Sequence, residues 1–217
     1  METRQSARVL QAVNIVVFLA TLVVNTFAST IGLNGSQTGV LSDAIPNLFV
    51  PSGLTFSIWG VIYIFLLLFT VAQSRGLFST RREAPASVER IGWLMVLSSA
   101  ANIGWLLLWH WRQVGFSLLA MLALLTCLIG IYLRLGMGRA SASPAERWFA
   151  RIPFSVYLGW ITVAMIANVT ALLVKAGWNR FGVAPKVWTV AVVAAAVVVV
   201  GIAVAALRSL LLTRRTR

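Results

Sequence analysis

Three groups of aromatic and amide side chains recur along this sequence at intervals of three or four residues. Residues at that spacing share one face of an α-helix. Three such faces turned toward one another would enclose an apolar cavity with flat walls and a few amide groups. This chemistry suits a large, planar, mostly apolar ligand. The predicted ligand-binding residues are Trp59 and Tyr63, then Asn102 and Trp105, and finally Tyr157, Trp160, Ala164 and Asn168.

The same side chains admit a second interpretation, in which they only hold helices together. Trp and Asn side chains form interhelical hydrogen bonds in membrane bundles. Asn168 lies in the middle of an apolar stretch, where an amide is costly unless it faces protein, water or ligand. The pattern therefore indicates an inward face and leaves open what that face contacts.

The usual catalytic and metal-binding sets are missing from the sequence. The chain has one histidine, His110, and one cysteine, Cys127, so we expect no metal site and no catalytic residue. The five acidic residues lie outside the apolar runs, which argues against a common ion-coupled pump. His110 stands between Trp109 and Trp111 at the end of an apolar run, so we expect it in an interfacial aromatic belt.

The elements that must position these residues are membrane helices. The chain of 217 residues is 59% hydrophobic and 11% charged, and runs of about 20 apolar residues can cross a bilayer. A net charge of +13 would suggest nucleic acid in a soluble protein, but here the basic residues lie between the apolar runs, so we expect no nucleic-acid partner. The expected spans are 9–28, 54–73, 91–109, 114–135, 154–176 and 187–212.

The basic residues also predict an orientation. Most of the 18 Lys and Arg fall at the termini, in the loop 74–90 and in a second basic loop with Arg134, Arg139, Arg147 and Arg151. Both termini are therefore expected to be cytoplasmic and the loop 29–53 external. Six of the nine Trp lie near span ends and are expected in the aromatic belts: Trp93, Trp109, Trp111, Trp148, Trp178 and Trp188.

In three segments the chain resembles the TspO/MBR family, also called translocator proteins or tryptophan-rich sensory proteins. Pro46 and Pro51 precede the Trp59 to Tyr63 spacing. The two further segments are Asn102 with Trp105, and the series from Tyr157 to Asn168. The resemblance covers residues 8–176, and residues 187–213 form an extra helix relative to the five-helix family.

The resemblance implies an all-α, TspO-like five-helix transmembrane bundle plus a sixth helix, in one domain spanning residues 1–217. It implies a receptor or sensor in a bacterial inner membrane, often a homodimer, that binds tetrapyrroles such as protoporphyrin IX or haem and requires no cofactor. For some bacterial relatives a light-dependent porphyrin breakdown has been proposed, so whether this chain is an enzyme stays open. Two alternatives also stay open: a transporter or exporter of small apolar solutes, and a structural or assembly subunit.

Overall fold

The computed structural model describes residues 2–45, 53–75, 77, 84–184, 186–191 and 194. Over these residues the chain is helical and contains no strand. The long helices are α1 (Glu2–Thr30), α3 (Ile58–Ser74), α5 (Leu94–His110), α6 (Val114–Arg134) and α8 (Ile152–Lys175). The short segments are α2 (Thr38–Asp43), η1 (Gly53–Ser57), α4 (Ala86–Ile91), α7 (Pro144–Glu146), the π-helix η2 (Arg147–Arg151) and η3 (Arg180–Gly182).

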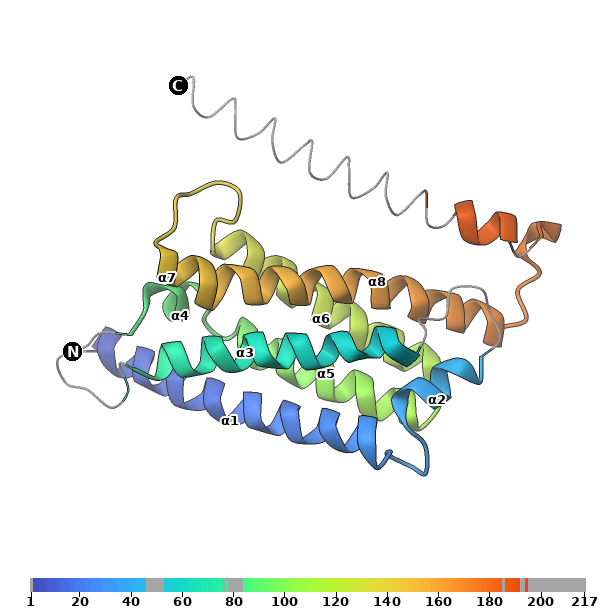
Figure 1. The fold of residues 1–217 in the computed structure, drawn as a ribbon, viewed down its shortest axis with the longest axis horizontal. Helices are drawn as coiled ribbons and strands as arrows, with labels where there is room; N and C mark the ends of the chain where they lie inside the picture. Colours follow the sequence, from blue (N-terminus) through green and yellow to red (C-terminus); the bar gives the residue numbers. More distant parts are fainter. Residues whose placement is uncertain are drawn as a thin grey trace, which may run out of the picture.

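The five long helices of the described part form a closed ring. Helix α1 packs on α3 and α5, helix α8 packs on α3 and α6, and α5 and α6 pack on each other. The helices run side by side along the long axis of the molecule (Figure 1). Helix α2 lies at one end of this bundle, and α4 and α7 lie at the other (Figure 1). A face that a long helix turns into the ring therefore meets helices that are distant in sequence.

Helix length and composition agree with a membrane protein. Four helical stretches of the described part are long and apolar enough to cross a bilayer: Gln5–Thr30, Thr55–Ser74, Val114–Arg134 and Pro144–Lys175. Helix α5 is apolar but shorter, with 17 residues. These five stretches lie where the first five spans were expected. The sixth expected span, 187–212, falls almost entirely outside the described residues, as do Pro46 and Pro51.

Helices α5, α6 and α8 end in the same way. After α8, the N–H groups of Gly177 and Trp178 donate to carbonyl groups of the last turn at 3.0 and 3.1 Å, and Gly177 has a φ of 67°. This is the Schellman arrangement, which needs a residue in the left-handed conformation. Gly136 holds that place after α6, and Arg112 holds it after α5 with a φ of 59°. Arg112 thus makes the tight turn between α5 and α6 at the cost of backbone strain.

Buried amides hold the helices of the ring together. The Asn25 side chain of α1 donates to the Asn102 side chain of α5 at 2.8 Å. On the same helix, Asn14 donates at 3.0 Å to the side chain of Gln73 on α3. Such bonds between helices contribute about 0.6 kcal/mol each on average in a membrane. Helix α1 is therefore joined through amides to both of its neighbours.

Candidate ligand pocket in the aromatic centre of the bundle

The indole ring of Trp59 is the centre of an aromatic cluster inside the ring of helices. It stacks on Tyr63 of its own helix with ring centroids 5.8 Å apart, and on Trp105 of α5 at 6.0 Å. Two rings of α8, Tyr157 and Trp160, meet it edge-on, each at 6.1 Å. Helices α3, α5 and α8 thus bring together, across the interior, aromatic residues from the three predicted groups.

A cavity adjoins this cluster on the side of α2. Its lining combines four indole rings and the Phe56 ring with small and hydroxyl side chains, so its walls are flat and mostly apolar. Measured as the space open to the centre of a water molecule, its volume is about 40 Å³, roughly three times what one water needs. The lining residues are Thr38, Ser42, Phe56, Trp59, Trp105, Trp109, Trp160, Ala164, Ala167, Asn168 and Ala171.

The structure divides the eight predicted ligand residues into two sets. Trp59, Trp105, Trp160, Ala164 and Asn168 line the cavity. The remaining three are buried or partly buried behind that lining: Tyr63 and Tyr157 pack against Trp59, and Asn102 pairs with Asn25 of α1.

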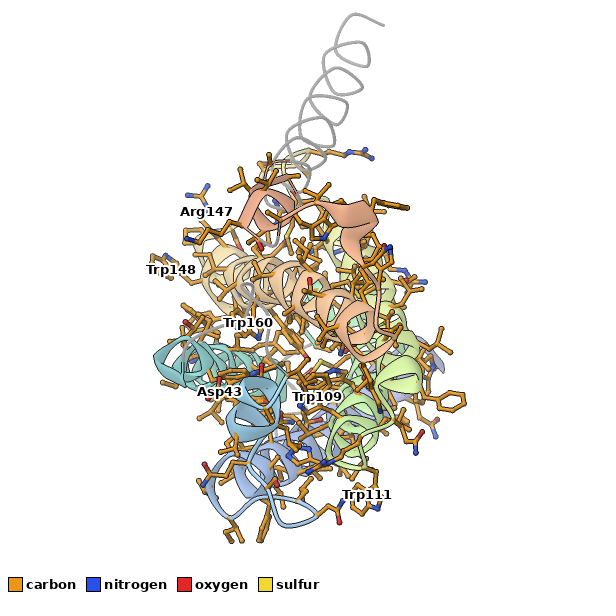
Figure 2. The ribbon with its side chains drawn as sticks, turned by 90° about the vertical axis from the view of Figure 1, so that its right-hand side faces the viewer. Asp43, Trp109, Trp111, Arg147, Trp148 and Trp160 are labelled. Carbon is orange, nitrogen blue, oxygen red and sulfur yellow. The ribbon has the colours of Figure 1, made fainter. Side chains whose placement is uncertain are left out.

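Two predictions for the end of α5 are wrong. Trp109 and His110 were expected in an interfacial belt, but their side chains are 7% and 1% exposed. Trp109 stacks on Trp105 with centroids 6.3 Å apart and lines the cavity. Figure 2, which looks along the helices, shows Trp109 and Trp160 toward the middle and Trp111 and Trp148 at the periphery. The loop 31–45, which follows α1 and contains α2, folds over the end of α5 and covers both residues.

His110 fastens that loop to the bundle. Its Nδ1 lies 2.7 Å from the carbonyl oxygen of Leu106, which can only accept, so Nδ1 carries a proton. In the neutral ring Nε2 then accepts from the Thr38 hydroxyl of α2 at 3.4 Å. The backbone carbonyl of His110 also accepts from the Asn34 side chain at 3.1 Å. These contacts set the position of α2 at the open end of the cavity.

Three indole N–H groups at this cavity have no hydrogen-bond partner among the residues that the structure describes. The Nε1 atoms of Trp105, Trp109 and Trp160 are buried, and no described residue accepts from them. An indole N–H is a donor only, and leaving a buried donor unpaired costs about 1–3 kcal/mol. The cavity thus combines flat apolar walls with several unpaired donors.

Asn168 is only weakly engaged by its neighbours. Its side-chain nitrogen lies 3.4 Å from the Ser117 hydroxyl of α6, and its side-chain oxygen lies 3.5 Å from the same hydroxyl. Both distances are long for a hydrogen bond. Asn102, by contrast, is tied to Asn25 at 2.8 Å. The two asparagines therefore differ in what holds them, which their positions in the sequence did not reveal. Neighbours such as Ala167 and Thr38 carried no sequence signal that would assign them to the cavity.

No cluster of His, Cys, Asp and Glu capable of holding a metal ion occurs among the residues that the structure describes. The fold and the site together define an integral membrane protein with an aromatic cavity inside an all-helical bundle. Residues 11–213 match the model of the family described as TSPO-like protein, so the chain belongs to the TSPO-like family. That match includes all of the residues 187–213. The comparisons with curated proteins and with solved structures give no match.

Proposed function

We propose that this protein is a membrane receptor or sensor that binds a flat, mostly apolar ligand of the tetrapyrrole class in the aromatic cavity. Trp59, Trp105 and Trp160 supply ring faces and edges against which a planar ligand packs. Ala164 of α8 lines the cavity with a small side chain that leaves room beside the rings. The chain belongs to the TSPO-like family, and the resemblance to TspO/MBR proteins implies the same class of ligand.

The observation that carries the proposal is the set of unpaired indole donors of Trp105, Trp109 and Trp160. A ligand that presents acceptor atoms would satisfy these donors, whereas a pure hydrocarbon would leave them unpaired. Tetrapyrroles combine a large flat apolar ring with carboxylate groups, which only accept when ionised. The flat apolar ring would lie against the aromatic walls, and the carboxylates would accept from the indole N–H groups.

Binding requires the cavity to widen. A flat ring between two others needs about 7 Å between them, twice the carbon contact distance of about 3.5 Å. Trp59 and Trp105 have centroids 6.0 Å apart, so the ligand must displace one ring or enter beside them. One wall is formed by α2. The single proton of the Thr38 hydroxyl on α2 can be accepted by Nε2 of His110 at 3.4 Å or by the Ala28 carbonyl at 3.5 Å, and both contacts are long. Displacement of α2 would open the cavity and would cost the Thr38 contact and the packing of Leu41, which is buried against Trp109.

The cavity suits protoporphyrin IX, which carries no metal, better than it suits haem. Haem iron takes an axial ligand from His, Cys, Met or Tyr. The described lining of the cavity contains none of these, and the chain's sole histidine is His110. Both of its ring nitrogens are engaged, with the Leu106 carbonyl and the Thr38 hydroxyl. Protoporphyrin IX needs no such ligand and can be held by stacking and hydrogen bonds alone.

The test is a titration of the purified protein with protoporphyrin IX, followed by the porphyrin absorption band. Trp160→Phe and Trp109→Phe each keep an aromatic ring and remove one N–H. We expect each to weaken binding about fivefold, the worth of one hydrogen bond of about 1 kcal/mol. Trp111→Phe is the matched control, because Trp111 is 53% exposed and should leave affinity unchanged.

The decisive test is the double variant that carries both Trp59→Phe and Trp160→Phe. Both indoles belong to the cavity wall and meet at a centroid distance of 6.1 Å. Wild-type affinity in this double variant would refute the assignment of the pocket. A porphyrin spectrum that reports a histidine-bound iron, after haem is added, would refute the preference for the metal-free ligand.

A further inference from the structure

A second pocket lies at the opposite end of the bundle, where α3 ends and α7 begins (Figure 1). Its volume is about 520 Å³ by the same measure, which is within the range of small-molecule sites. Phe69 in its wall is ten residues beyond Trp59 on α3, or about 15 Å along the helix axis. The second pocket is therefore distinct from the aromatic cavity.

The lining of the second pocket is amphipathic. Apolar walls come from α3 and from the π-helix η2, with Phe69, Ala72, Phe149 and Ala150. A π-helix is rare and occurs frequently at functional sites. The polar part of the lining consists of Gln73, Arg75, Ser87, Ser143 and Glu146. A ligand that fills this space would need an apolar body and a polar end.

The charges around the second pocket are unbalanced toward positive. Glu146 is the carboxylate in the described lining, and it is already paired with Arg90 at 2.7 Å and with Arg151 at 2.8 Å. Arg151 also donates to the Ala140 carbonyl at 2.7 Å, which fixes it in place. In the described lining and its ion pairs, the guanidinium groups of Arg75, Arg90 and Arg151 thus stand against the carboxylate of Glu146.

Arg75 is the guanidinium that remains for a ligand. It lies 6.0 Å from the centre of the Phe149 ring, and no described residue forms an ion pair or hydrogen bond with it. A guanidinium offers five N–H donors in a fork that matches carboxylate and phosphate oxygens. Its place beside Phe149 sets an anion-binding group next to the apolar wall.

We propose that the second pocket binds an amphiphile that carries one anionic headgroup, with the headgroup on Arg75 and the apolar chain against Phe69, Ala72 and Phe149. The headgroup chemistry, a phosphate or carboxylate, is shared by two sources: an anionic membrane lipid and a free fatty acid. Basic pockets between membrane helices are suited to anionic headgroups. The inference concerns a site separate from the aromatic cavity and does not depend on tetrapyrrole binding.

The experiment is calorimetric titration of the full-length protein in a neutral detergent. The probes are dioctanoyl phosphatidylglycerol, decanoate, dioctanoyl phosphatidylcholine and inorganic phosphate. We expect saturable binding of at least one of the first two probes, with the zwitterionic lipid about tenfold weaker and phosphate not bound. Phosphatidylglycerol alone would identify a membrane lipid as the source, and decanoate alone a free fatty acid. Equal affinity for the zwitterionic and anionic lipids, or saturation by phosphate, would overturn the proposal.

Two matched pairs of variants separate the pocket from general electrostatics. Arg75→Gln should weaken the anionic probe about tenfold, whereas Arg139→Gln removes an exposed charge of the same region and should have no effect. Ala72→Phe fills part of the pocket and should also weaken binding. Its neighbour Val71 is 53% exposed and outside the lining, so Val71→Phe should bind as the wild type does. An equal effect of both members of either pair would refute the site.

Discussion

The two buried asparagines of the predicted site should have separate roles, and single substitutions can show this. Asn102 is 0% exposed, is paired with Asn25 at 2.8 Å, and does not line the aromatic cavity. Asn168 is 3% exposed, lines the cavity, and has only the 3.4–3.5 Å contacts with Ser117. We therefore expect Asn102→Ala to lower stability and Asn168→Ala to lower ligand affinity.

The expected magnitudes follow from these contacts. Hydrogen bonds between membrane helices average about 0.6 kcal/mol and reach about 1.7 kcal/mol. The short Asn25–Asn102 bond belongs in the upper part of that range, so Asn102→Ala should cost about 1 kcal/mol or more. The long contacts of Asn168 place its coupling to Ser117 below about 0.6 kcal/mol. If Asn168 donates to the ligand, its removal should weaken protoporphyrin IX binding about fivefold.

Two assays measure these effects on the same preparations. Unfolding in mixed micelles with increasing dodecyl sulfate gives stability, and double-mutant cycles with Asn25→Ala and Ser117→Ala isolate each pair. Porphyrin titration gives affinity. Our reasoning would be refuted if Asn102→Ala weakened porphyrin binding as strongly as Asn168→Ala while leaving stability unchanged. The reasoning would also fail if the coupling free energy of the Ser117–Asn168 pair exceeded that of the Asn25–Asn102 pair.

Two further predictions concern the end of α5. Arg112 has a φ of 59°, so Arg112→Gly should raise the free energy of unfolding by about 0.5–1 kcal/mol, measured by the same micelle assay. Gln113→Gly should lower the free energy of unfolding. Gln113 has an ordinary φ of −84°, so glycine relieves no strain there and only increases the conformational entropy of the unfolded chain. His110→Ala removes the side-chain contact with α2, so hydrogen exchange at the amides of Thr38–Asp43 should become faster. Trp111→Ala should not change that exchange, and equal rates in both variants would contradict the proposed anchor.

The sequence by itself determined where the five long apolar helices lie. The expected spans 114–135 and 154–176 correspond closely to α6 (Val114–Arg134) and α8 (Ile152–Lys175). Hydrophobic length predicts a span because an apolar run of about 20 residues has no better environment than the bilayer. The expected start of the second span at residue 54 differs because the chain there forms η1 before α3. Helix ends are set by local hydrogen bonding, which hydropathy does not report.

Helical periodicity also identified the inward faces, since it fixes which side chains share a direction. It could not fix how far each helix is rotated or which helix it meets across the ring. Trp59 and Trp105 stack at 6.0 Å although α3 and α5 are not neighbours in the ring. Whether an amide at such a position joins two helices or faces the cavity depends on that rotation.

The end of α5 shows most clearly what only the tertiary structure decided. Trp109 and His110 have the sequence context of belt residues, yet the loop 31–45 covers them and binds His110 through Thr38 and Asn34. The pattern within a helix contains no information about a loop that is distant in sequence and folds over its end. The sequence therefore determined the helices and their inward faces. The packing of five helices and one loop decided which of those side chains form the cavity.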